Sequence, residues 1–380
     1  MTRDLRLDAI RRPLQLPHHP LYRFYQGGGL AQEFRGLPAP KDSWWSEDWV
    51  GSVTSAGNPD PDGNVQGLSR VDVPGVGEVT LRELVETYPE EMIGTAFADR
   101  WGVTTGVLVK LLAPGGRVPL HGHPNRTWAS DHLGSPWGKA EAWILLDTPG
   151  TAEEPPYAGI GFREGVTYKG FRAAMDRQDS AELRAMLNRT EIRPGETWLM
   201  NPRVPHLLGP RLLFIEIQEP SDHIVIPEWW ASGVDQDAAT MGLGWDLALE
   251  MLDFSATVTR EEALGQARQP ETVLRSSGGG AARADGGATR ETRLFAPDAL
   301  QFFDAHRLEV ADQLPVEDRR FSIDIVTGGD GWIEGEWGRT PIERGRTFAT
   351  AASLPHRFVA GSIALEVVRC MGPALQPALG

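Results

Sequence analysis

Short apolar segments bounded by glycine and proline recur along the chain, and they constrain its fold more than any other feature. Val107–Leu112, Glu141–Asp147 and Arg211–Ile217 each have the length of a single buried strand, and the first ends just before Pro114 and Gly115. The 380 residues include 43 glycines and 29 prolines, so turns must be frequent. This combination favours many short strands over long helices.

Helical composition is confined to a few stretches between these strands. Leu81, Leu84, Val85 and Tyr88 fall at helical spacing before Pro89. We also expect helix over residues 171–188 and 244–267. The segment 276–288 contains five glycines and no large apolar residue, which predicts a flexible linker.

After the linker, four short apolar segments follow at regular spacing. They are 321–326, 332–337, 347–350 and 363–368. Such a series, with glycine between its members, predicts a small β-sandwich or barrel. We therefore divide the chain into an N-terminal domain with a helical insertion (1–242), a helical segment with the glycine-rich linker (243–290) and a C-terminal β-lobe (291–380).

The charge balance excludes several classes of partner. Thirty-seven Lys and Arg stand against 52 Asp and Glu, a formal net charge of −15 that repels nucleic acid and anionic membranes. No apolar run is long enough to cross a bilayer. The single Cys370 excludes a disulfide framework and a cysteine-based zinc cluster, which favours a cytoplasmic location. Any metal must be held by histidine and carboxylate.

Three separated segments carry potential metal ligands. On a strand, His121 and His123 point to the same face and can present both imidazoles to one ion. Two such histidines alone could equally be exposed or structural. However, Glu141 begins an apolar strand, where an unpaired charge is costly, and His206 precedes another apolar strand. This order of ligands is similar to that of the cupin β-barrel.

Four motifs in order resemble those of the type I phosphomannose isomerases, which are zinc cupins that interconvert mannose 6-phosphate and fructose 6-phosphate. The resemblance spans about Leu21 to Arg369. Its motifs are Ser46–Trp49, Leu120–Asn125, Gly138–Trp143, and Pro194–His206 followed by Glu216–Gln218 and Ser221–Asp222. In that family His121 usually corresponds to a glutamine.

The resemblance implies a mostly β fold: a cupin (double-stranded β-helix, jelly-roll) barrel with helical insertions and a second, metal-free cupin-like lobe. It implies one Zn²⁺ per chain, held by His121, His123, Glu141 and His206. It also implies a zinc-dependent aldose–ketose isomerase that acts through an enediolate. The expected partner is a small-molecule sugar or sugar phosphate, and the chain could form a homo-oligomer.

Isomerisation requires a proton-transfer group near the metal. The resemblance brings Lys139 to the same strand face as Glu141, and Glu216 is the second candidate. The sequence does not decide between them. Without the resemblance, Lys139 would be a surface lysine, and Glu216 could instead pair with Arg211 or Arg203.

One position departs from the family pattern and leaves the phosphate without its expected partner. Ile226 stands where the family usually carries an arginine after Ser221–Asp222, and an aliphatic side chain cannot bind phosphate. Arg203 and Arg126 are candidate replacements, and Trp229 is a candidate for stacking on a sugar. Each of the three has a simpler interpretation, as a solvated loop residue or as part of the core.

Three alternatives therefore stay open. The same isomerase chemistry could act on an unphosphorylated sugar. Three histidines and one glutamate could instead hold iron in a cupin oxygenase. The chain could also be a sugar-binding regulator without activity.

Overall fold

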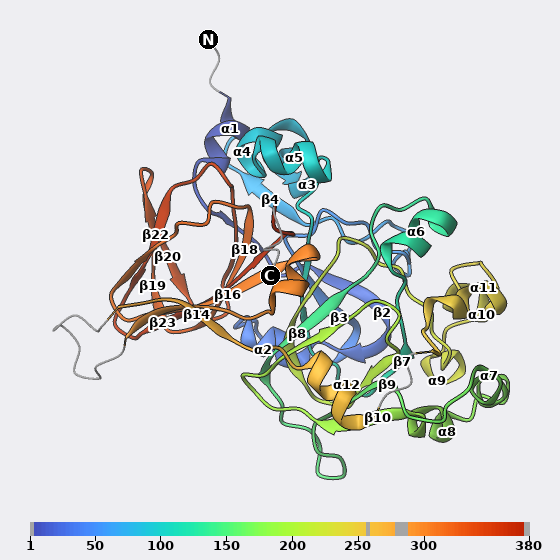
Figure 1. Ribbon diagram of the computed structural model, residues 1–380. Coiled ribbons are helices and arrows are strands. Elements are labelled where there is room, and N and C mark those ends of the chain that lie inside the picture. Colours follow the sequence, from blue (N-terminus) through green and yellow to red (C-terminus); the bar gives the residue numbers. More distant parts are fainter. Residues whose placement is uncertain (1–3, 256–258, 278–287, 376–380) are drawn as a thin grey trace.

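The computed structural model describes residues 4–255, 259–277 and 288–375 (Figure 1). Most of its regular structure is antiparallel strand, which confirms the expected mostly β class. None of the helices in these ranges is long and apolar enough to cross a membrane.

Two sheets from the N-terminal part carry the predicted metal ligands. The larger has the strand order β11-β8-β13-β6-β3-β2 and the smaller has the order β10-β9-β12-β7. Strands such as β6, β9 and β13 are buried along their whole length, which explains why their sequences are mainly apolar. The strands are β2 (Pro20–Gly27), β3 (Ser43–Val50), β6 (Leu108–Leu112), β7 (Val118–His121), β8 (Glu141–Asp147), β9 (Tyr157–Phe162), β10 (Leu187–Glu191), β11 (Thr197–Met200), β12 (His206–Leu208) and β13 (Leu213–Gln218).

Two further sheets are built mainly from the C-terminal part. Their orders are β1-β21-β18-β23-β16-β15-β14 and β17-β22-β19-β20, and β4 (Arg70–Val73) pairs separately with β5 (Gly77–Thr80). The strands are β1 (Leu14–Gln15), β14 (Thr272–Ser277), β15 (Thr289–Arg293), β16 (Asp304–Val310), β17 (Gln313–Pro315), β18 (Ser322–Gly328), β19 (Asp330–Gly335), β20 (Gly338–Glu343), β21 (Thr347–Thr350), β22 (His356–Ala360) and β23 (Leu365–Met371). The N-terminal strand β1 thus completes a sheet whose other members all follow residue 270.

Short helices cover the ends and edges of the sheets (Figure 1). They are α1 (Leu5–Ile10), α2 (Gly29–Phe34), α3 (Leu81–Thr87), α4 (Pro89–Met92), α5 (Thr95–Trp101), α6 (Arg126–Leu133), α7 (Tyr168–Asp176), α8 (Ser180–Ala185), α9 (Trp229–Ser232), α10 (Gln236–Ala239), α11 (Trp245–Ala248) and α12 (Arg260–Ala267), with the 3₁₀ turns η1 (Leu249–Met251) and η2 (Pro297–Gln301). The Asn125 side chain caps α6 by accepting a hydrogen bond from the Trp128 amide at 2.8 Å.

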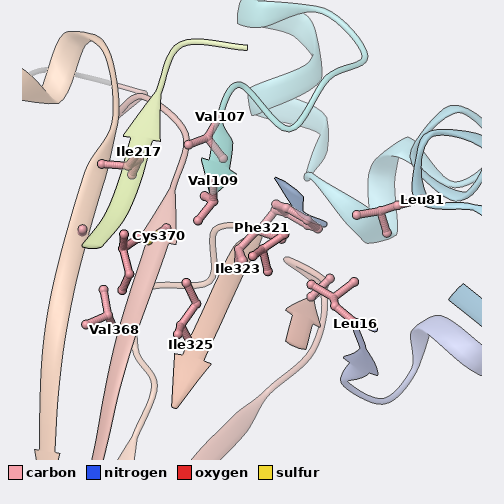
Figure 2. Packing of buried hydrophobic residues seen from close by; sticks show 14 of the residues in the cluster. Leu16, Leu81, Val107, Val109, Ile217, Phe321, Ile323, Ile325, Val368 and Cys370 are labelled. Atoms are coloured by element: carbon pink, nitrogen blue, oxygen red, sulfur yellow. The ribbon is translucent and has the colours of Figure 1, made fainter. Parts of the chain in front are cut away.

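One hydrophobic cluster joins strands from both parts of the chain. Val109 on β6 and Ile217 on β13 share this cluster with Ile323 on β18 and Val368 on β23 (Figure 2). The division at residues 242 and 290 stays a prediction.

The predicted strands are confirmed to within a few residues, whereas two predicted helices are not continuous. The chain turns after α7, where Gln178 has a φ of 51°, and Leu187 already belongs to strand β10. Residues 244–267 form α11, η1 and α12 rather than one helix. Of the predicted linker, residues 278–287 lie outside the described residues, and Ser277 ends β14.

Candidate metal centre

Strand pairing brings the predicted histidines together. His121 ends β7, and His206 begins β12 directly opposite it in the antiparallel register. Their ring centroids lie 4.2 Å apart, and the His123 ring lies 5.1 Å from each. His123 follows a bridge between Gly122 and Val225, which continues the strand direction past the end of β7. The three rings therefore share one face of the smaller sheet.

Glu141 reaches the histidines from the larger sheet, where it begins β8. A close backbone approach at Gly138 makes this possible, because a Cβ there would lie 2.7 Å from the Arg126 amide nitrogen. Next to it, the Lys139 amide donates to the Pro124 carbonyl at 2.9 Å. The loop after His123 is thus fixed against the start of β8.

Hydrogen bonds orient all three rings toward one point. The Nδ1 atoms of His121, His123 and His206 lie 2.7–2.8 Å from backbone carbonyl oxygens, which requires the proton on Nδ1. The Nε2 atoms of His123 and His206 are left facing the Glu141 carboxylate at 3.0 and 2.9 Å. The four ligand atoms lie within 4.8 Å of one another, and they include buried atoms without hydrogen-bond partners. These residues fit a divalent metal ion.

The electrostatics of the cluster favour the protonation states that bind metal. Burial lowers the pKa of His121 well below its usual value and that of His123 to about 3, so both rings are neutral at pH 7. Burial alone would raise the pKa of Glu141, but His123, Lys139 and His206 together hold it well below the usual range. Neutral imidazoles and an ionised carboxylate are the ligand forms that zinc requires.

Both predicted proton-transfer groups line a small cavity that His121 and Glu141 of the cluster also line. The Lys139 Nζ lies 3.4 Å from a Glu141 oxygen, and its side chain is buried. Glu216 does not pair with Arg211 or Arg203; it accepts a hydrogen bond from Lys110 at 2.9 Å. Burial raises the pKa of Glu216, with Lys110 opposing the rise.

A buried charge network lies beside the metal ligands, and the sequence did not predict it as a unit, although Glu216 was a proton-transfer candidate and Glu47 and Asp222 lie in two of the motifs. It consists of Arg23, Glu47, Lys110, Glu216 and Asp222. Arg23 donates to Asp222 at 3.0 and 3.2 Å and to Glu47 at 3.2 Å, and Lys110 lies 3.5 Å from Glu47. These contacts lower the pKa of Glu47 to about 2 despite its burial. For Lys110 the available signal was its position inside the apolar run 107–112, because a buried lysine needs a partner.

Two cavities adjoin the cluster. The inner one has a volume of about 30 Å³ and is lined by Lys139, Glu141 and Glu216 among others. The outer one has a volume of about 850 Å³. Arg23 and Phe24 line both, so they stand between the metal ligands and the larger space.

The three predicted substrate-binding residues are not brought to either cavity. Arg126 donates to Glu219 at 2.5 Å and lies against the rings of Trp101 and Trp137. The Arg203 amide donates to the His123 carbonyl at 2.8 Å, but its side chain lines a separate, acidic cavity. Trp229 packs edge-on against its neighbour in α9. Their roles in substrate binding stay predictions without a supporting contact.

The C-terminal part, expected to hold no metal, contains one more group of potential ligands, which are Asp304, His306 and Asp318. Arg320 donates to Asp304 at 2.8 Å and also pairs with Asp318, so both carboxylates already have a cation. His306 donates to Glu291 at 2.8 Å. This group is accounted for as an ion-pair network within the sheet.

No protein-family profile matches the chain. Over 143 residues the chain is 27% identical to the mannose-6-phosphate isomerase ManA of Bacillus subtilis strain 168. This match covers 38% of the chain but only 41% of the relative, so it leaves more than half of that enzyme uncompared.

Solved structures extend the likeness to nearly the whole fold. The mannose 6-phosphate isomerase of Bacillus subtilis superimposes with a TM-score of 0.69 at 18% identity, covering 94% of this chain and 99% of that one. A variant of phosphomannose isomerase from Salmonella typhimurium gives a TM-score of 0.66 at 14% identity, covering 95% and 100%. The chain therefore has the fold of these isomerases, and the resemblance to the mannose-6-phosphate isomerase family that its motifs suggested is confirmed.

Proposed function

We propose that the chain is a metal-dependent aldose–ketose isomerase. The observation that carries this proposal is the buried cluster of His121, His123, Glu141 and His206. Lys139 and Glu216 line a small cavity together with two of these ligands, His121 and Glu141. The names of the sequence and fold relatives support the reaction class. They suggest mannose 6-phosphate as the substrate, and the motif resemblance implies fructose 6-phosphate as its product.

Zinc suits the proposed ligands, because imidazole nitrogen and carboxylate oxygen are both common zinc ligands. A bound divalent ion would polarise the carbonyl and hydroxyl oxygens at C1 and C2 of the sugar and stabilise the enediolate. One zinc per chain follows from the single cluster of this kind among the described residues.

The protein's own part in the reaction is to move a proton between C1 and C2. Lys139 and Glu216 are the candidates, since both line the inner cavity and are buried. Because burial raises the pKa of Glu216, this pKa lies closer to pH 7 than that of an ordinary carboxyl, which favours reversible proton transfer. Lys110, bonded to Glu216, would keep that carboxylate oriented.

A second candidate is the same chemistry on an unphosphorylated sugar, which is favoured by the buried, aliphatic Ile226 beside Asp222. An iron oxygenase at the same four ligands is a weaker candidate, because it leaves Lys139 without a role. Cytoplasmic location and homo-oligomer formation remain expectations from the sequence.

Proton NMR in heavy water tests the proposal. Zinc-loaded protein is given mannose 6-phosphate and, in parallel, free mannose. We expect conversion to the corresponding ketose, with deuterium incorporated at C1 or C2, and no conversion after chelation of the metal. Failure to isomerise any aldose or ketose with zinc bound would overturn the proposal, and oxygen consumption that depends on ferrous iron would support the oxygenase.

A further inference from the structure

The inner cavity is too small for a whole sugar. Its volume of about 30 Å³ leaves room for only a few atoms. Only the reacting end of a substrate can lie there, and the rest must extend into a neighbouring space. Arg23, Phe24 and Ile224 line both the inner cavity and the outer cavity of about 850 Å³, so the outer cavity is that space.

The outer cavity has the walls of a carbohydrate site. Tyr22 from β2 and Trp44 from β3 line it, with ring centroids 6.5 Å apart. Trp44 is 44% exposed although it is large and aromatic, which suits a ring that covers the apolar face of a sugar. Ile224 and Ile226, from the segment after β13, add aliphatic surface to the lining.

Polar groups that could bind hydroxyls are also present. The Nε2 atom of His223 is buried without a hydrogen-bond partner, and this residue lines the cavity. The backbone carbonyl of the same residue fixes the His123 ring at 2.8 Å. A sugar hydroxyl bonded to the His223 ring would therefore contact the same residue whose backbone carbonyl orients His123. Asp237, on the same wall, offers a carboxylate.

The charges of the lining disfavour phosphate. Its formally charged residues are Arg23, Asp222 and Asp237, one cation against two anions. Arg23 is already engaged, because its guanidinium bonds to Asp222, Glu47 and Asn58. A phosphate dianion would meet a net negative wall in a chain of charge −15.

We propose that the outer cavity binds the non-reacting part of the substrate and that this part is uncharged carbohydrate. This inference rests on the proposed isomerase function and narrows its substrate to unphosphorylated sugars. Trp44 covers one face of the sugar, and His223 and Asp237 bind its hydroxyls.

Saturation-transfer difference NMR of the zinc-loaded and the chelator-treated protein tests binding directly, with mannose and mannose 6-phosphate as probes. We expect the wild type to bind mannose at least about tenfold more tightly than mannose 6-phosphate. Trp44→Ala should weaken mannose binding about tenfold, the loss of one stacking face. Trp230→Ala is the matched control, because Trp230 is 72% exposed and does not line the cavity. Zinc content should be unchanged in both variants.

A gain of function provides the opposite test. Ile226→Arg places a cation in the lining and should raise the affinity for mannose 6-phosphate relative to mannose by about tenfold or more. Tighter wild-type binding of mannose 6-phosphate, or mannose binding that is equal in Trp44→Ala and Trp230→Ala, overturns the inference even if isomerase activity is found. Binding of mannose that depends on Trp44, without any turnover, supports the inference and refutes the proposed function instead.

Discussion

Replacing Lys110 with methionine tests the charge network beside the metal cluster. Lys110 is 2% exposed, and its Nζ lies 2.9 Å from Glu216 and 3.5 Å from Glu47. Methionine keeps most of the side-chain volume, so little of the effect comes from a cavity. The variant instead leaves the buried Glu216 carboxylate without its cation, whereas Glu47 keeps Arg23 at 3.2 Å, and this loss should cost about 3–5 kcal/mol of unfolding free energy.

Urea unfolding followed by tryptophan fluorescence measures this loss as a lower midpoint at an unchanged slope. The control is Arg172→Met, in which the lost side chain is partly exposed and its partners Asp176 and Asp246 lie in solvent. This variant should lose less than about 1 kcal/mol. The double variant Lys110→Met/Glu216→Gln should recover part of the loss, because one uncompensated charge is gone.

The stability loss caused by Lys110→Met should change with pH in a defined direction. The pKa of Glu216 is already raised by burial, and it rises further without Lys110. A carboxyl with a raised native pKa destabilises the fold above that pKa and stops doing so when it is protonated. The penalty of Lys110→Met should therefore shrink from about pH 7 to about pH 5. A loss below about 1 kcal/mol at pH 7 would refute the reasoning.

Three further predictions concern the ligands, the packing beside them and the C-terminal sheet. Glu141→Gln removes the anionic ligand, so zinc retained after dialysis should fall well below the wild-type level; equal retention counts against the site. A Cβ on Gly122 would lie 2.3 Å from Leu252 Cδ2, so Gly122→Ala should cost about 1–3 kcal/mol in urea, whereas Gly116→Ala, with open space around it, should cost little. Burial alone would lower the pKa of His306, but hydrogen bonds to its two carboxylate partners raise it, so the stability from its proton is complete below about pH 6.5 and is lost above the raised pKa. The stability difference between wild type and His306→Gln should shrink from about pH 6 to about pH 9, and a constant difference contradicts this assignment.

The sequence predicts those parts of the fold that local pattern determines. Residues 141–147 form β8 as expected, and its first five residues are buried, as a short and mainly apolar run predicts. The helix expected over residues 171–188 fails because Asp179 caps a new helix, α8, after a turn at Gln178. Its alanines and leucines are compatible with either arrangement, so composition could not locate the break.

The sequence predicts a residue of the candidate site only where that residue belongs to a recognisable motif. The four ligands come from three motifs, and the structure brings them together. Arg23 finds its partner Asp222 across 199 positions, and no local pattern contains that pairing. Arg126 was a candidate for substrate because its sequence neighbours are ligands, yet its partner Glu219 lies on another segment. Long-range pairing is the information that a single sequence lacks.

The pairing of β1 with β21 also affects when the protein can finish folding during synthesis. Leu14 lies opposite Ala349, and Arg35 donates to the Thr347 hydroxyl. These N-terminal residues therefore cannot make their native contacts until residues 347–349 have been synthesised. Ribosomes add roughly 5–20 residues per second, so this delay is on the order of tens of seconds. During that time the apolar face that Leu16 and Leu81 share with Ile323 is uncovered. A nascent chain arrested before β18 should therefore bind chaperones that recognise exposed apolar surface, and release them once β21 has left the ribosome.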